Sequence, residues 1–252
     1  MIGIYDLNSC SSLGFKDRLD IYKKCGFKEV ALYLDSSYQT NNENYIDIIN
    51  YAREIGLQIL QVHIDWKISN LICDNDTNEY FEYISKKLTE AKNLGIKFVV
   101  AHSSQSNNPP MISSKQLEKF KTTISQFKNQ NIYLCLETVR NNDNLDKILE
   151  LNLDTVKVCY DLGHAHCYGN EKDMYEKYKD KIACSHLHNN YGKDEHKPLN
   201  EGDIDYKYFL DKLSSLNNAS NCLECFPPLG SNLTKEEFNI FVAKCYETVK
   251  DY

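Results

Sequence analysis

The sequence alternates from end to end between short apolar runs and amphipathic segments. In each amphipathic segment the apolar residues recur every three or four positions, which is the period of a helix with one buried face. The predicted strands are residues 2–7, 29–34, 58–64, 97–102, 132–138, 156–161, 182–188 and 221–226. The predicted helices are residues 15–25, 45–55, 78–94, 113–129, 144–151, 172–178, 206–216 and 233–249.

Strands that alternate with helices favour a parallel sheet with helices on its outside. Eight strand–helix units in 252 residues correspond to the size of a (β/α)8 barrel. We therefore predict an α/β fold, a TIM barrel that forms a single domain over residues 1–252. A doubly wound open sheet is the alternative. No linker, low-complexity tract or change in composition indicates a second domain.

Capping residues support several of the predicted helix ends. Thr234 and Glu237 have the spacing of a capping box before the last helix. Gly26, Gly56 and Gly95 each follow a helical pattern, where a glycine commonly ends a helix.

The net charge and the lengths of the apolar runs argue against binding to nucleic acid and against insertion into a membrane. A net charge of −7 argues against a general electrostatic surface for nucleic acid, although a local basic patch is still compatible with it. No apolar run approaches the roughly 18 residues of a membrane span. The start, MIGIYDLNSC, lacks the basic and apolar regions of a signal peptide. Because most of the 10 cysteines lie in strand-like runs, we expect a cytoplasmic protein with reduced thiols.

Polar residues gather where the predicted strands end. In a (β/α)8 barrel the active site lies at these C-terminal ends. A carboxylate at the end of a buried strand costs free energy unless it is paired or bound to a metal. Carboxylates and imidazoles without thiolate suit Mn²⁺, Mg²⁺, Co²⁺ or Zn²⁺. The candidates are His63, Trp66, His102, Glu137, Asp161, His164, His186, His188, Asp194, His196 and Glu224.

The segment VCYDLGHAHCYG shows this pattern most clearly. An apolar run ends in Asp161, Gly163 predicts a turn, and His164 and His166 follow. This order of a strand, an acidic residue, a turn and an imidazole indicates a metal site at the C-terminal end of the strand.

Four cysteines lie two residues before predicted ligands and therefore on the same strand face. They are Cys135, Cys159, Cys184 and Cys222. We predict that they line the barrel interior one layer below the site as small apolar core residues, not as a thiolate metal cluster. Cys222 and Cys225 form a CxxC, but on a strand the two side chains point to opposite faces.

The second half of the chain resembles the xylose isomerase-like barrel superfamily, which joins sugar phosphate isomerases and epimerases with AP endonuclease family 2, the endonuclease IV type. The segments that carry the resemblance are LCLETV, VCYDLGHAH, HLHNNYGKDEHKPLNEGDID and CLECFP. The third is the most specific, because D-x-H followed by an E-G-D-I turn is a long match.

The resemblance implies two alternative ligand sets. The epimerase pattern holds one divalent metal, and its ligands match Glu137, Asp161, His186 and Glu224. The endonuclease pattern adds further ligands that build a three-zinc site, and these match His63, His102, His164, Asp194 and His196.

Departures from the endonuclease pattern favour the isomerase group. This chain has DLGHA in place of DTCHA, HLHN in place of HLND, and His102-Ser103-Ser104 in place of H-P-G. The loops also lack a rich set of basic residues that would hold a duplex. An arginine that ketose epimerases carry after the seventh strand is absent, which leaves the substrate open.

The resemblance therefore implies a divalent-metal-dependent enzyme, a sugar or sugar phosphate isomerase or epimerase. Glu137 and Glu224 would transfer the proton next to a carbonyl, and His164, Trp66 and His188 would bind the sugar; His166 would only support the site. The alternative is an endonuclease IV-like phosphodiesterase with three zinc ions, and a third is a barrel that binds a metabolite without chemistry. The sequence leaves a homo-oligomer open.

Overall fold

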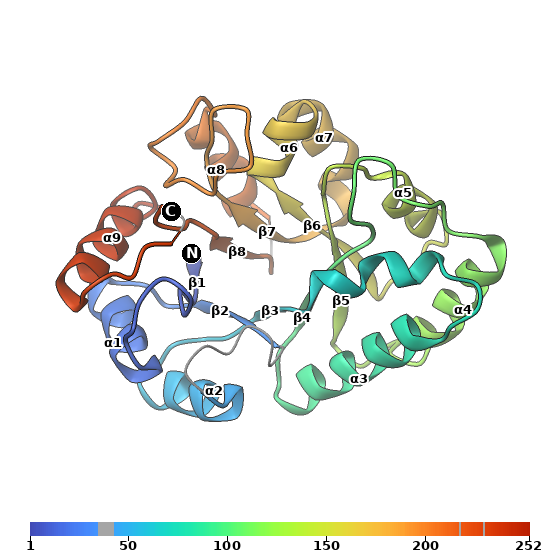
Figure 1. Cartoon of the computed structure of the whole chain (residues 1–252), viewed down its shortest axis with the longest axis horizontal. Helices are drawn as coiled ribbons and strands as arrows, with labels where there is room; N and C mark the ends of the chain where they lie inside the picture. Colours follow the sequence, from blue (N-terminus) through green and yellow to red (C-terminus); the bar gives the residue numbers. More distant parts are fainter. Residues whose placement is uncertain (35–42, 217, 229) are drawn as a thin grey trace.

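The computed structural model describes residues 1–34, 43–216, 218–228 and 230–252. Its centre is a closed barrel in which the parallel strands pair in chain order and β8 pairs with β1 (Figure 1). This confirms the predicted (β/α)8 barrel and excludes the open sheet. The strands are β1 (Ile2–Tyr5), β2 (Val30–Tyr33), β3 (Gln61–His63), β4 (Phe98–His102), β5 (Tyr133–Glu137), β6 (Val156–Asp161), β7 (Ile182–Leu187) and β8 (Ser220–Leu223).

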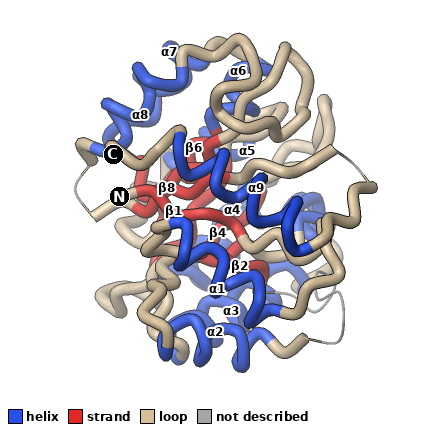
Figure 2. Tube along the Cα trace, turned by 90° about the vertical axis from the view of Figure 1, so that its left-hand side faces the viewer, coloured by secondary structure: helices blue, strands red, loops and turns tan. Residues whose placement is uncertain are grey.

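Helices surround the barrel (Figure 1), and the side view shows the strands at the centre of the molecule (Figure 2). Every predicted helix is present, with ends that differ by a few residues from the prediction. The helices are α1 (Phe15–Cys25), α2 (Tyr45–Glu54), α3 (Glu79–Asn93), α4 (Ser114–Ser125), α5 (Asp143–Leu149), α6 (Leu162–Tyr168), α7 (Glu171–Tyr178), α8 (Tyr206–Ser214) and α9 (Lys235–Glu247), with the 3₁₀ segments η3 (Trp66–Cys73) and η4 (Lys179–Lys181).

The structure corrects the turn that the sequence predicted at Gly163. This glycine lies in the first turn of α6, which begins directly after β6. The Asp161 carboxylate caps the helix by accepting a hydrogen bond of 2.6 Å from the backbone N–H of His164. The sequence did not reveal α6 because a short segment with a glycine and two histidines lacks the apolar period of a helix.

The predicted helix ends are confirmed. Thr234 and Glu237 form both hydrogen bonds of the capping box at the start of α9. Gly26, Gly56 and Gly95 all have positive φ angles, which side chains rarely adopt.

The apolar core has an outer and an inner part. The outer part lies between the strands and the inner faces of the helices. The inner part fills the barrel with two small clusters, one containing Cys135, Cys159 and Cys184, the other Tyr5, Ala31 and Cys222. The four cysteines are fully buried free thiols, as predicted. These cysteines lie in the barrel interior, one layer below the polar residues at the strand ends.

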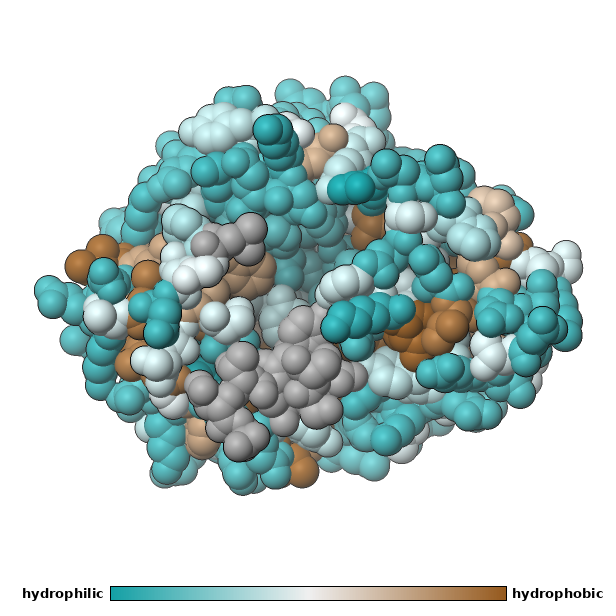
Figure 3. Space-filling model, viewed as in Figure 1, coloured by the Kyte–Doolittle hydropathy of each residue, from teal (hydrophilic) through white to brown (hydrophobic). Residues whose placement is uncertain are grey.

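The face seen in Figure 1 is hollowed near its middle, and hydrophilic residues border the upper side of the hollow (Figure 3). Among the residues that the structure describes, no helix is long and apolar enough to cross a membrane.

Candidate metal centre

Four buried side chains meet at the C-terminal ends of β5 to β8. His186 Nδ1 lies 3.3 Å from Glu137 Oε2, 3.8 Å from Asp161 Oδ2 and 3.2 Å from Glu224 Oε2. One possible ligand atom from each of the four lies within 4.8 Å of the others. We call these four residues the central group. Its spacing suits a single bound cation.

Two further histidines approach Glu137 from β3 and β4. His63 Nε2 lies 3.0 Å, and His102 Nε2 3.2 Å, from Glu137 Oε2. The paired strands explain this approach, because His102 and Glu137 are register partners in β4 and β5. Glu137 therefore belongs both to the central group and to a second group with His63 and His102.

A third group forms beside Asp161. His164 Nε2 lies 3.4 Å from Asp194 Oδ2, and His196 Nε2 lies 3.1 Å from Asp194 Oδ1. His188 stacks on His196, with ring centroids 3.9 Å apart and an angle of 13° between the rings. The structure thus brings together every residue that the sequence nominated as a metal ligand. It adds His188 and, next to Glu137 and His186, the Cys159 thiol.

Three histidines have one ring nitrogen bound to a backbone carbonyl. The pairs are His63 Nδ1 with Ile64 O at 2.6 Å, His164 Nδ1 with Thr138 O at 3.1 Å and His196 Nδ1 with Glu224 O at 2.9 Å. A carbonyl only accepts, so each of these nitrogens carries a proton. In the neutral ring the other nitrogen then presents a lone pair to a carboxylate. Such a contact repels unless a proton or a cation lies between the two groups.

Two fully buried atoms of the central group, Asp161 Oδ2 and His186 Nδ1, make no hydrogen bond of suitable geometry. The carboxylates 3.2 Å and 3.3 Å from His186 Nδ1 are not aligned with its ring nitrogen. An unsatisfied buried polar group costs about 1–3 kcal/mol. A divalent ion between these atoms would satisfy both, and three carboxylates with one imidazole suit such an ion. The residues therefore fit the divalent metal that the resemblance implies.

The charges of the central group favour a cation. Burial raises the pKa of Glu137, but His102 and His186 lower it more, so it lies well below its usual range. In the same way burial raises the pKa of Glu224 while His186 more than reverses the shift. Burial lowers the pKa of His186, but the two glutamates raise it well above its ordinary value. Both carboxylates are thus ionised at neutral pH, and the site attracts positive charge.

Asp161 is held in place through its other oxygen. Asp161 Oδ1 accepts from the His164 backbone N–H and lies 3.1 Å from His188 Nε2. His188 is fully buried, and a Cβ on Gly163 would lie only 1.9 Å from its ring. Gly163 therefore lets the imidazole approach Asp161. The substrate contact predicted for His188 stays a prediction; in the described geometry the ring touches protein groups.

The loop between β7 and α8 is organised by Asn189. Its side chain donates to Leu199 O at 2.6 Å, and its carbonyl oxygen accepts from the backbone N–H of Asn190 at 2.8 Å and of Ile204 at 3.1 Å. A Cβ on Gly202 would lie 2.2 Å from Asn189 Oδ1. The EGDI turn, residues 201–204, thus packs against Asn189 and holds the loop that carries Asp194 and His196 of the third group.

Two tyrosines at the site were not found from the sequence. The Tyr33 hydroxyl donates to Glu224 Oε1 at 3.1 Å, and the Tyr5 hydroxyl lies 2.9 Å from His186 Nε2. Both lie at strand positions whose side chains point into the barrel, like those of the ligands. This alternation along the strands is the signal that could have revealed them.

Trp66 and His166 lie outside the three groups. Trp66 is half-buried at the start of η3, where the Lys67 ammonium lies 5.8 Å from its ring centroid. His166 lies 3.4 Å from Glu171 Oε2, and the supporting role expected for it stays a prediction. The sugar contact predicted for Trp66 stays a prediction.

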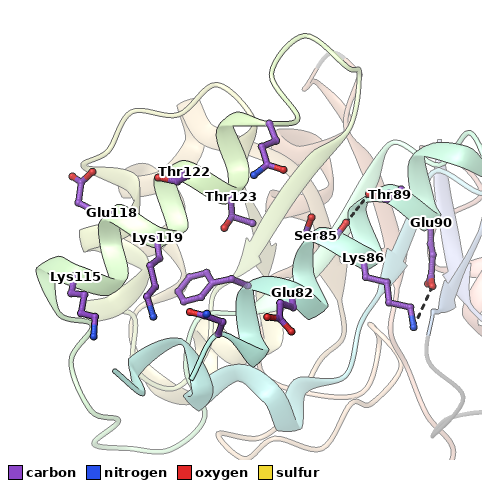
Figure 4. Close-up of a pocket in the computed structure, with 13 residues that line it drawn as sticks. Glu82, Ser85, Lys86, Thr89, Glu90, Lys115, Glu118, Lys119, Thr122 and Thr123 are labelled. Carbon is purple, nitrogen blue, oxygen red and sulfur yellow. Dashed lines mark hydrogen bonds and ion pairs between the residues drawn. The ribbon is translucent and has the colours of Figure 1, made fainter. Parts of the chain in front are cut away.

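A groove of about 850 Å³ runs between α3 and α4 on the outside of the barrel (Figure 4). Phe81 lines it, and lysines and glutamates such as Lys119 and Glu82 alternate along its walls. None of the residues of the three groups lines this groove, so we do not connect it with the metal centre.

The sequence model of the xylose isomerase-like TIM barrel family matches residues 19–241. The chain belongs to this family. Among curated proteins, an uncharacterised protein of Sinorhizobium fredii is 22% identical over 243 residues, which is 81% of this chain and 78% of that protein. One of Methanocaldococcus jannaschii is 36% identical over 75 residues, 29% of this chain and 30% of that protein.

Several solved structures share the fold over nearly the whole chain. An L-ribulose 3-epimerase has a TM-score of 0.76 at 15% identity and covers 99% of this chain and 93% of its own. A D-psicose 3-epimerase from Clostridium cellulolyticum, solved with D-tagatose, has a TM-score of 0.76 at 12% identity, with 99% and 98% covered. A probable 3-DHS dehydratase from Bacillus anthracis has a TM-score of 0.72 at 15% identity, with 96% and 97% covered. At these identities the likeness establishes the fold alone.

Proposed function

We propose that this family member is a divalent-metal-dependent isomerase or epimerase of a sugar or sugar phosphate. The observation that carries the proposal is the approach of Glu137 and Glu224 to the same atom, His186 Nδ1, at 3.3 Å and 3.2 Å. Two ionised carboxylates around one cation site are suited to moving a proton at a carbon next to a carbonyl. The 3-epimerases among the structural neighbours support this choice of substrate class.

The roles of the residues follow from their charge and position. A divalent ion in the central group would polarise the carbonyl and hydroxyl oxygens of the substrate. One of Glu137 and Glu224 accepts the proton from carbon, and the other returns a proton to carbon. The Tyr33 hydroxyl holds Glu224 Oε1 and leaves Oε2 facing His186. We assign His164 to a substrate oxygen, because its ring reaches from Glu137 to Asp194.

Exchange of substrate hydrogen with solvent tests this function. The Mn²⁺-loaded protein is incubated in D₂O with a panel of ketoses, aldoses and their phosphates, and deuterium at carbon is followed by mass spectrometry. We expect one substrate class to take up deuterium at the carbon next to the carbonyl. Glu137→Gln and Glu224→Gln should each slow this exchange by roughly 10²–10⁴-fold, because each removes a base. Glu150→Gln, at an exposed position after α5, is the matched control.

Exchange that continues unchanged in Glu137→Gln would show that the two-glutamate mechanism is wrong. If the protein binds Mn²⁺ but no substrate of the panel takes up deuterium at carbon, this would count against a sugar isomerase or epimerase.

A second candidate is a metal-dependent phosphodiesterase of the endonuclease type. The observation that favours it is the presence of three adjoining ligand groups, two of which share Glu137. Clustered metals can stabilise both the attacking and the leaving oxygen of a phosphodiester. The net charge of −7 speaks against a duplex substrate. Three tightly bound zinc ions together with cleavage of an abasic oligonucleotide would support this candidate over the isomerase.

A further inference from the structure

A line of hydrogen bonds leaves the metal centre and runs through the barrel interior. His186 Nε2 lies 2.9 Å from the Tyr5 hydroxyl, which lies 3.4 Å from Gln61 Oε1. Gln61 Nε2 lies 3.0 Å from Ser220 Oγ, and the Ser220 hydroxyl donates to Glu29 Oε1. Ser220 opens β8 and Glu29 directly precedes β2. The line therefore ends at the opposite end of the strands from His186.

The hydrogen bonds all point the same way. Gln61 Oε1 only accepts, so the Tyr5 hydroxyl donates to it and its own oxygen accepts from His186 Nε2–H. The Gln61 amide donates to Ser220, whose hydroxyl donates to the carboxylate of Glu29. Hydrogen bonds in such a chain polarise one another in the same direction. Each N–H or O–H in the line is thus drawn toward Glu29.

The line is shielded from solvent along its whole length. Tyr5, Gln61, His186 and Ser220 are fully buried, and Glu29 is 3% exposed. Burial raises the pKa of Glu29 to about 7, so this carboxylate changes charge near neutral pH.

Among the described residues, other titratable groups also face the two ends of this line. Glu29 faces the Cys222 thiol of β8 and the amino terminus of the chain, as well as Ser220. The titratable groups around the Tyr5 hydroxyl are Tyr33, Cys159, Cys222, His186 and Glu224. The buried thiols stay neutral, since burial raises the pKa of both Cys159 and Cys222.

We propose that Glu29 is a positioning residue that tunes His186 as a metal ligand through Ser220, Gln61 and Tyr5. An ionised Glu29 draws the His186 Nε2 proton toward Tyr5 and so increases the electron density on Nδ1. Partners behind a ligating histidine orient the ring and raise its basicity in this way. The inference rests on the proposed metal centre, because it needs His186 Nδ1 to face an ion.

Metal affinity measured at two pH values tests the role of Glu29. Mn²⁺ binding to the whole chain is measured by calorimetry at about pH 6 and about pH 8, below and above the pKa of Glu29. Glu29→Gln keeps the shape and an acceptor for Ser220 but cannot ionise. We expect it to bind Mn²⁺ about 10-fold more weakly than the wild type at the higher pH and with nearly equal affinity at the lower pH.

Two serines provide a matched pair of variants. Ser220→Ala interrupts the line, whereas Ser185→Ala removes an equally buried hydroxyl that bonds Asn221 outside it. We expect Ser220→Ala to weaken Mn²⁺ binding at the higher pH and Ser185→Ala to leave it unchanged. A Glu29→Gln protein with wild-type affinity at both pH values would overturn the role of Glu29 alone. A wild-type chain without Mn²⁺ binding would overturn the metal centre and, with it, this role.

Discussion

Single atoms decide how the residues of the metal centre act. Asp161 uses Oδ1 to cap α6 and to face His188, which leaves Oδ2 buried and without a partner beside His186. Sequence parity could predict that Asp161 reaches the barrel mouth. It could not predict that Oδ1 contacts protein groups while Oδ2 is left for a cation, because this depends on the close approach of Gly163 to His188.

Gly163→Ala tests this close approach. The added Cβ would lie 1.9 Å from the His188 ring, so the ring must move away from Asp161. We expect the free energy of unfolding to fall by about 1–3 kcal/mol in metal-free protein, and Mn²⁺ affinity to fall as well. Urea unfolding and calorimetry measure the two effects. Gly14→Ala is the control, because a Cβ there meets nothing within 4 Å; equal behaviour of the two variants would contradict the role of Gly163.

At the scale of elements, the sequence revealed those with a clear period and missed those without one. The eight strands and their helices follow from apolar spacing, whereas α6, which carries His164 of the third group, has no such period. The loop between β7 and α8 was recognised only through its resemblance to a known motif. The structure gives the physical reason for that motif, which is the set of hydrogen bonds around Asn189.

Asn189→Ala should loosen this loop. It removes an amide NH₂ and a carbonyl oxygen that together bond four backbone groups, and each group left unsatisfied costs about 1–3 kcal/mol. We expect faster hydrogen–deuterium exchange over residues 190–204 and a smaller free energy of unfolding. Asn108→Ala, at an exposed loop position, is the control. Unchanged exchange in the loop would mean that Asn189 does not hold it.

For the whole molecule, the barrel explains why distant sequence segments share one site. Parallel strands that close in chain order bring their C-terminal ends to one mouth, so residues from His63 to Glu224 become neighbours. The sequence could predict this convergence. It could not predict which ligands pair, because the pairing depends on register, such as His102 opposite Glu137 and Asp161 opposite His186.

Native mass spectrometry with Mn²⁺ tests most directly whether the central group holds a metal. Wild type is compared with Asp161→Asn, which keeps the size and the Oδ1 acceptor but removes the charge at the unpartnered oxygen. We predict at least one Mn²⁺ ion bound to each wild-type chain and the loss of one ion in Asp161→Asn. A wild-type chain that binds no divalent ion, or an Asp161→Asn chain that keeps every ion, would contradict the metal centre.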